Sequence, residues 1–258
     1  MEFGLEGKVA MVAAASKGIG LAIAQELARE GCRISICARN EEVLEAAASM
    51  ISEDARTYVV DVSDREDLEW WFDQTKADLG PVDLLVTNTG GPPAGPLASL
   101  TDEQWQLGFD STLMNVVRMV QLAKADMIER GWGRIVHLTS LVAVQPSDLL
   151  PISSTLRAGL QALTRTQSNE LARYGITVNA VLPGHTMTDR QRHLAKIRSE
   201  RDGISEADAL SSQAEEVPVG RIADPEEIAA AVAFLCSTRA SYISGTSLLV
   251  DGGLTKGY

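Results

Sequence analysis

Short apolar runs alternate with longer amphipathic stretches along almost the whole of this sequence. Each run is nearly continuous in Val, Ile, Leu and Ala, which is typical of parallel strands that are buried on both faces. The runs predict seven strands, over residues 9–13, 33–38, 57–60, 84–87, 135–139, 177–182 and 247–250. The stretches between them predict helices over residues 19–30, 41–51, 65–79, 102–130, 154–174 and 225–237.

This alternation indicates an α/β fold. Strands and helices joined by right-handed crossovers give a doubly wound parallel sheet with helices on both of its faces. No linker or low-complexity tract interrupts the pattern, so we expect residues 1–258 to form a single domain. Residues 189–217 differ, because they are polar and contain no strand. Their place after the sixth strand predicts a lid over the carboxyl ends of the strands.

Composition and charge exclude several classes of protein. Apolar residues make up 45% of the chain and charged residues 22%, which excludes a disordered chain. The net charge of −12 predicts a surface that repels phosphate backbones and anionic lipid, so we expect neither nucleic acid nor membrane as a partner. No apolar run approaches the length of a membrane span, and no signal peptide is visible. We therefore expect a cytoplasmic protein whose three cysteines are small buried side chains.

A turn that contains glycine follows the first predicted strand and opens the first predicted helix. It comprises residues 14–20, Ala-Ala-Ser-Lys-Gly-Ile-Gly. Glycines at such a turn let backbone amides at a helix N-terminus approach a pyrophosphate. The turn therefore predicts a dinucleotide site, although an ordinary strand-to-helix turn would also favour glycine.

Further motifs follow in order along the chain, and together with the glycine turn they resemble the short-chain dehydrogenase/reductase family. They are Asp61-Val62, Asn88-Thr89-Gly90, Ser140, Pro183-Gly184 with Thr188, and Asp251-Gly252-Gly253. The resemblance extends over essentially the whole chain and is nearest to the β-ketoacyl carrier-protein reductase branch. It implies a Rossmann-type domain, a nicotinamide cofactor and a homo-oligomer, either a dimer or a tetramer, in which the helices over 102–130 and 154–174 pack between subunits.

Charge argues for NADP(H) as the cofactor. An NAD site places a carboxylate after the second strand to hold the ribose 2′-hydroxyl, but this chain has Arg39 and Asn40 there. Arg39 and Lys17 are suited to hold a 2′-phosphate, or else Arg39 is a solvated loop residue. No metal ion is expected. The residues expected to bind the cofactor are Ala14, Ser16, Lys17, Gly18, Ile19, Gly20, Arg39, Asp61, Val62, Asn88, Gly90, Arg157, Pro183, Gly184, Thr186 and Thr188.

Most of the catalytic positions that the resemblance implies are substituted. Family members reduce a carbonyl with a Ser, a Tyr, a Lys and an Asn that act together. Ser140 matches the serine, but Ser153 occupies the position of the tyrosine, Arg157 that of the lysine and Thr112 that of the asparagine. Ala14 likewise replaces the first glycine of the cofactor turn.

These substitutions change the expected chemistry. A serine hydroxyl is a poorer proton donor than a phenol, whose pKa is about 10. His185 directly follows Pro183-Gly184 and is either a substitute proton donor or an ordinary loop histidine. His137 alternates within a predicted buried strand, so we expect it to be a hydrogen-bonded core residue. The candidate catalytic residues are Ser140, Ser153, Arg157, Thr112 and His185.

We expect an NADP-dependent oxidoreductase that slowly reduces a keto group of a 3-oxoacyl-like substrate, a small ketone or an acyl thioester. One alternative is an NADP(H)-binding sensor or scaffold without catalysis. Another is a sheet used only for protein assembly. The basic first half of the lid, residues 189–201, either docks an acidic carrier protein or forms a solvated helix face. Apolar side chains are expected at the mouth of the substrate site, namely Leu97, Leu141, Leu149, Leu150 and Met187.

Overall fold

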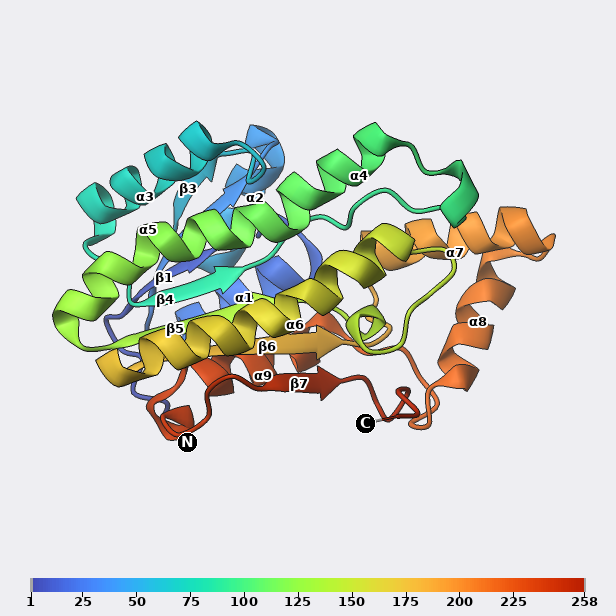
Figure 1. Cartoon of the computed structure of the whole chain (residues 1–258). Coiled ribbons are helices and arrows are strands. Elements are labelled where there is room, and N and C mark those ends of the chain that lie inside the picture. The colour runs from blue at the N-terminus through green and yellow to red at the C-terminus, as the bar shows by residue number, and fades with distance from the viewer. Residues whose placement is uncertain (1, 258) are drawn as a thin grey trace.

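Seven parallel strands form the sheet in this computed structural model, which describes residues 2–257 (Figure 1). Their order across the sheet is β3-β2-β1-β4-β5-β6-β7, which confirms the predicted doubly wound fold. The order reverses between β1 and β4, and such a switch point opens a crevice at the carboxyl ends of the strands. The strands are β1 (Val9–Val12), β2 (Arg33–Ala38), β3 (Arg56–Val59), β4 (Leu84–Thr87), β5 (Gly133–Leu138), β6 (Ile176–Pro183) and β7 (Ser247–Val250).

Helices follow the strands and cover both faces of the sheet (Figure 1). The α-helices are α1 (Gly18–Arg29), α2 (Glu41–Ile51), α3 (Arg65–Leu79), α4 (Asp102–Phe109), α5 (Asn115–Arg130), α6 (Pro151–Leu171), α7 (Asp189–Asp202), α8 (Glu206–Glu216) and α9 (Pro225–Cys236). Shorter helical turns are η1 (Leu97–Ser99), η2 (Asp110–Met114), η3 (Leu141–Ala143), η4 (Ala172–Tyr174) and η5 (Thr238–Ala240). No helix between residues 2 and 257 combines the length and the apolar content that crossing a bilayer requires.

The hydrophobic core lies in two layers, one on each face of the sheet. Because side chains alternate along a strand, Ala10 and Val12 of β1 enter the layer under α1, α2 and α9, whereas Met11 enters the layer under α3 and α5. Trp71 of α3 is fully buried in the second layer, and its indole Nε1 donates a hydrogen bond to Ser35 Oγ at 2.9 Å. The core thus fixes the strands whose ends carry the site.

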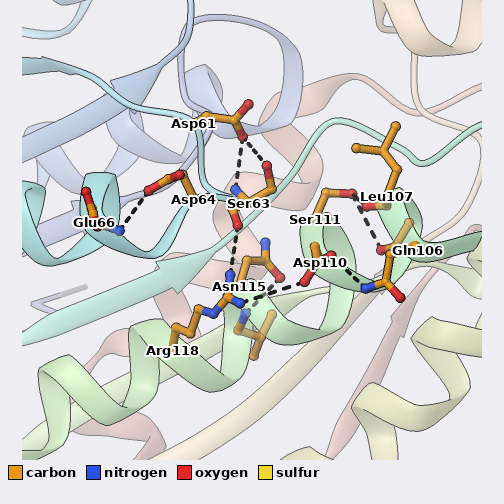
Figure 2. Close-up of polar contacts among 12 residues, drawn as sticks. Asp61, Ser63, Asp64, Glu66, Gln106, Leu107, Asp110, Ser111, Asn115 and Arg118 are labelled. Carbon is orange, nitrogen blue, oxygen red and sulfur yellow. Dashed lines mark hydrogen bonds and ion pairs between the residues drawn. The ribbon is translucent and has the colours of Figure 1, made fainter. Parts of the chain in front are cut away.

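One predicted helix is interrupted in the structure. The stretch 102–130 divides into α4, the π-helical turn η2 and α5. Ser111 Oγ donates to the backbone oxygen of Leu107 at 2.7 Å (Figure 2). A serine side chain that takes an i−4 carbonyl competes with the regular helical ladder and favours a bend. Periodicity alone predicts a continuous helix here, because the apolar spacing continues through the turn.

The segment predicted as a lid consists of α7 and α8, which pack against each other beside the carboxyl ends of the strands (Figure 1). Gln191 Nε2 donates to Gln213 Oε1 at 2.6 Å between the two helices. Arg198 of α7 also pairs with Glu216 of α8 at 3.3 Å. The basic half of the segment is therefore partly neutralised by its acidic half.

Candidate functional site

A cleft of about 820 Å³ opens at the carboxyl ends of the strands, with the first residues of α7 along one wall. All the residues predicted to bind the cofactor line it, as do three of the predicted catalytic residues. The cofactor set in the cleft is Ala14, Ser16, Lys17, Gly18, Ile19, Gly20, Arg39, Asp61, Val62, Asn88, Gly90, Arg157, Pro183, Gly184, Thr186 and Thr188. The catalytic candidates in the cleft are Ser140, Ser153 and Arg157.

The glycine turn has the close packing that a dinucleotide cradle requires. A Cβ added to Gly20 would lie 2.6 Å from the backbone oxygen of Ala14 and 2.8 Å from Asn88 Nδ2. Asn88 Nδ2 donates to that same Ala14 oxygen at 3.1 Å, so the end of β4 holds the turn in place. Gly18 has a φ of +53°, which favours glycine over other residues.

The N-terminus of α1 presents backbone amides to the cleft. Its N-cap residue, Lys17, makes no side-chain capping hydrogen bond, so the amides of the first turn keep their donor capacity. An uncapped helix N-terminus at a glycine turn binds a phosphate through those amides and the helix dipole. The residues present therefore fit the pyrophosphate of a dinucleotide.

The loops after β2 and β3 bring opposite charges to the other end of the cleft. Asp61 follows β3, and its Oδ1 accepts hydrogen bonds from the backbone and the hydroxyl of Ser63 at 2.9 and 2.7 Å (Figure 2). Burial acts to raise the pKa of Asp61, but the Ser63 hydrogen bonds and the charge of Arg39 lower it overall. Arg118 of α5 donates to the backbone oxygen of Ser63 at 2.7 Å and ties this loop to the helix beyond η2.

Ser153 and Arg157 form a buried pair on α6. They lie one helical turn apart, and Arg157 Nε donates to Ser153 Oγ at 3.1 Å. Arg157 Nη1 donates to the backbone oxygen of Leu138, at the end of β5, at 3.0 Å. Ser140, just beyond β5, accepts a hydrogen bond from the backbone amide of Val142 at 3.3 Å. Both serines therefore keep their own O–H free to donate to a ligand.

Arg157 is a cation in an unusually dry position. Only 7% of its surface is exposed. Burial lowers its pKa to about 10, and the nearby charge of Arg190 acts in the same direction. A guanidinium with this pKa is still protonated at neutral pH. The pair thus places a permanent positive charge next to the hydroxyl of Ser153.

Two of the predicted catalytic residues do not line the cleft. Thr112 is fully buried within η2, and its hydroxyl oxygen has no hydrogen-bond partner among residues 2–257. His185 is not among the residues that line the cleft; burial lowers its pKa, and the charges of Glu216 and Arg198 act in opposite directions. The structure does not bring His185 together with Ser140 and Ser153, so its role as a proton donor stays a prediction.

His137 is a core residue, as expected. Its Nδ1 lies 2.8 Å from Thr87 Oγ1, and its Nε2 lies 2.8 Å from Gln167 Oε1. Burial lowers the pKa of His137 to about 4. The neutral ring of His137 thus links β5 to β4 and α6. It is not among the residues that line the cleft.

Arg190 lines the cleft, although its sequence position did not predict a site residue. Arg190 Nη2 donates to the backbone oxygen of Pro92 at 2.9 Å, so the first turn of α7 reaches the loop after β4. Gly91 makes room for this contact, because a Cβ there would lie 2.8 Å from Arg190 Nε. Arg190 lies two residues after Thr188, a predicted cofactor residue, so its nearness to the site could have been inferred from the sequence. The contact itself depends on how the lid folds back.

The apolar lining also differs from the prediction. Of the five side chains expected at the mouth, Leu150 lines the cleft. Leu141 instead packs in a small core cluster with Val142 and Val217. Three leucines that were not predicted also line the cleft, namely Leu107, Leu138 and Leu194. Sequence order alone does not determine which faces of the loops turn inward.

A family model described as Enoyl-(Acyl carrier protein) reductase matches residues 13–255. The chain belongs to the short-chain dehydrogenase/reductase family. It is 35% identical over 253 residues to a 3-oxoacyl-acyl-carrier-protein reductase of Haemophilus influenzae, a match that covers 97% of this chain and 99% of that protein.

Two solved structures of this family superpose closely on the chain. L-sorbose reductase from Gluconobacter frateurii, complexed with NADPH and L-sorbose, has a TM-score of 0.94 at 35% identity and covers 100% of both chains. A single-substitution variant of actinorhodin polyketide ketoreductase, with NADPH, has a TM-score of 0.94 at 35% identity, with 97% of this chain and 98% of the other covered. Membership of the family thus agrees with the resemblance found in the sequence.

Proposed function

We propose that this protein is an NADP(H)-dependent reductase that acts on a keto group through Ser140, Ser153 and Arg157. The observation that carries the proposal is the bond from Arg157 Nε to Ser153 Oγ, inside a cleft that also holds the complete predicted cofactor set. The relatives support the reaction type, because 3-oxoacyl reduction and sorbose reduction both convert a ketone into an alcohol.

The cofactor side of the proposal rests on the cradle and on charge. The uncapped N-terminus of α1 suits the pyrophosphate, and Gly20 lets the turn pack closely against Ala14 and Asn88. Arg39 is exposed directly after β2, where Arg39 and Asn40 stand in place of the carboxylate that would hold a ribose 2′-hydroxyl. A guanidinium in that place favours the 2′-phosphate of NADP(H).

NADPH supplies the hydride in this reaction. Ser140 and Ser153 donate hydrogen bonds to the carbonyl oxygen of the substrate, since neither hydroxyl proton is committed to a protein acceptor. The charge of Arg157 stabilises the negative charge that develops on that oxygen, and its effect is strong because Arg157 itself is buried. Arg157 also polarises the Ser153 hydroxyl, which passes its proton to the product oxygen and regains one from water in the cleft.

The first test follows NADPH oxidation with a 3-oxoacyl thioester and with the corresponding free keto acid, in wild type and in Ser153→Ala. Removing a hydroxyl that donates to the reacting oxygen is expected to lower kcat by ~10²-fold, with little change in the Kd for NADPH. Thr166→Ala is the matched control, because this hydroxyl lies on the exposed side of the same helix and bonds only to the Ala162 oxygen. Equal kcat values in wild type and Ser153→Ala would exclude the proposed role of Ser153.

A second variant separates catalysis from cofactor sensing. Ser153→Tyr, Arg157→Lys and Thr112→Asn together install the family's usual side chains at the substituted positions. A wild type that binds NADPH but does not turn over, beside an active triple variant, would support the sensor or scaffold alternative. Turnover by the wild type would exclude it.

We also propose that the protein forms a homo-oligomer. Leu107 and Phe109 of α4 are 54% and 37% exposed, which leaves apolar surface on the helices that the family packs between subunits. The edge strand β7 adds two partly exposed leucines, Leu248 and Leu249.

A further inference from the structure

Two arginines face the same end of the cleft without a counter-ion. Arg157 and Arg190 both line it, and neither forms an ion pair with any carboxylate of residues 2–257. Their hydrogen bonds go to neutral oxygens of Leu138, Ser153 and Pro92. Burial lowers the pKa of both guanidinium groups, and the charge of Arg190 adds to the effect on Arg157. Two desolvated cations close together are unfavourable unless an anion joins them.

The other arginines of the lid behave differently from Arg190. Arg192 pairs with Asp189 at 3.4 Å, Arg198 with Glu216 at 3.3 Å, and Arg201 with Asp202 at 2.6 Å. Arg190 alone among the arginines of α7 turns inward, onto Gly91 and Pro92, and forms no such pair within the described residues. The lid therefore directs one cation into the cleft and neutralises its neighbours at the surface.

The carboxylates that line the cleft are engaged elsewhere. Asp189 lies 3.6 Å from Lys17 of the glycine turn. Asp61 accepts hydrogen bonds from Ser63 at the opposite end, near Arg39. The end with Ser140, Ser153, Arg157 and Arg190 is thus a local positive region in a chain whose net charge is −12.

Apolar side chains complete this end of the cleft. Leu107, Leu150 and Leu194, from α4, from the residue before α6 and from α7, line it together with the two arginines. A ligand that matches both the two arginines and the three leucines carries one anionic group and an apolar chain.

We propose that the substrate is a keto acid with an apolar chain, whose free carboxylate binds Arg190 in the field of Arg157. This inference rests on the proposed function and narrows it, since the acyl part of a thioester or an ester would leave Arg190 without an anionic partner. A carboxylate accepts charge-assisted hydrogen bonds from a guanidinium, and the one hydrogen bond that Arg190 makes, from Nη2 to Pro92, leaves N–H groups of this side chain to donate to it.

The cofactor pyrophosphate is a second candidate anionic partner for Arg190, and the test separates the two. Octanoate and octanamide have the same chain length and differ in charge, and neither is reduced. Each is titrated into the NADP⁺-loaded protein by calorimetry, in wild type, Arg190→Gln and Arg192→Gln. The Kd for NADP⁺ is measured in all three proteins.

Wild type is expected to bind octanoate about tenfold more tightly than octanamide, the size of one charge-assisted contact. Arg190→Gln should bring this ratio close to one and leave the Kd for NADP⁺ unchanged. Arg192→Gln should keep the wild-type ratio, because that side chain is exposed and already paired.

Equal binding of the two ligands by wild type would overturn the proposal. The proposal would also be overturned if Arg190→Gln kept the wild-type ratio of the two Kd values, or if this variant lost affinity for NADP⁺ alone. The measurement needs no turnover. A protein that prefers octanoate but reduces no ketone would therefore refute the proposed function and not the anion site, and the reverse result would refute the anion site alone.

Discussion

Ala14 adopts a backbone conformation that is rare for an L-residue. Its φ is +48°, at the position where the family has glycine. The left-handed conformation costs a residue with a Cβ about 1–2 kcal/mol, and the greater flexibility of glycine in the unfolded chain offsets part of this. Ala14→Gly is therefore expected to raise the free energy of unfolding by up to about 1 kcal/mol, measured by urea denaturation. A lower unfolding free energy in Ala14→Gly would contradict the assignment of strain.

His137 makes stability depend on pH. Burial lowers the pKa of His137 from 6.5 to about 4. Between these two pH values the unfolded chain binds a proton at this residue and the folded chain does not. The unfolding free energy therefore falls as the pH decreases below about 6.5, and the loss ends near pH 4. Between about pH 7.5 and about pH 5, the contribution of this residue is on the order of 2 kcal/mol.

The measurement compares urea unfolding at the two pH values in wild type and His137→Gln. The variant is less stable overall, but its loss on acidification should be smaller by roughly the same 2 kcal/mol. An identical pH response in wild type and His137→Gln would show that His137 is not held neutral in the fold.

At the scale of elements, the junction of β1, β4 and α1 is the proposed cradle of the cofactor. Gly20→Ala places a methyl group against the Ala14 oxygen and Asn88 Nδ2, so the turn must open. We expect a loss of NADPH affinity of about tenfold or more, measured by fluorescence titration, and a lower unfolding free energy.

Gly159→Ala is the matched control for that prediction. Gly159 lies within α6, and a Cβ there meets no atom within 4 Å. Alanine has the higher helix propensity, so this variant should be more stable by up to about 1 kcal/mol and bind NADPH as wild type does. Similar losses of NADPH affinity in Gly20→Ala and Gly159→Ala would mean that the effect at Gly20 does not come from its contacts with Ala14 and Asn88.

For the whole molecule, the oligomeric state tests the exposed surface of α4. The chain has a mass of 27.7 kDa, and light scattering should give a dimer or tetramer of it. Phe109→Glu should shift the protein toward the monomer, because a charge at an apolar interface is costly to desolvate. Met50→Glu, at a 60% exposed residue of α2, should leave the assembly intact. A wild type that is monomeric at micromolar concentration would refute the homo-oligomer.

The sequence by itself determined the order of strands and helices, because a strand buried on both faces and an amphipathic helix each leave a local pattern. It also predicted the place of the cofactor cradle, since the glycine turn lies where one strand ends and one helix begins. Even the bond between Arg157 and Ser153 was implicit in their spacing of one helical turn.

The tertiary structure alone decided the features that depend on contacts between distant segments. The π-helical turn η2, the absence of His185 from the cleft lining and the inward place of Arg190 leave no periodic signal. Arg190 reaches Pro92 only because α7 folds back over the loop after β4, and Gly91 leaves it room. Whether a charged side chain is solvated or buried in a cleft depends on what packs around it, which local sequence does not encode.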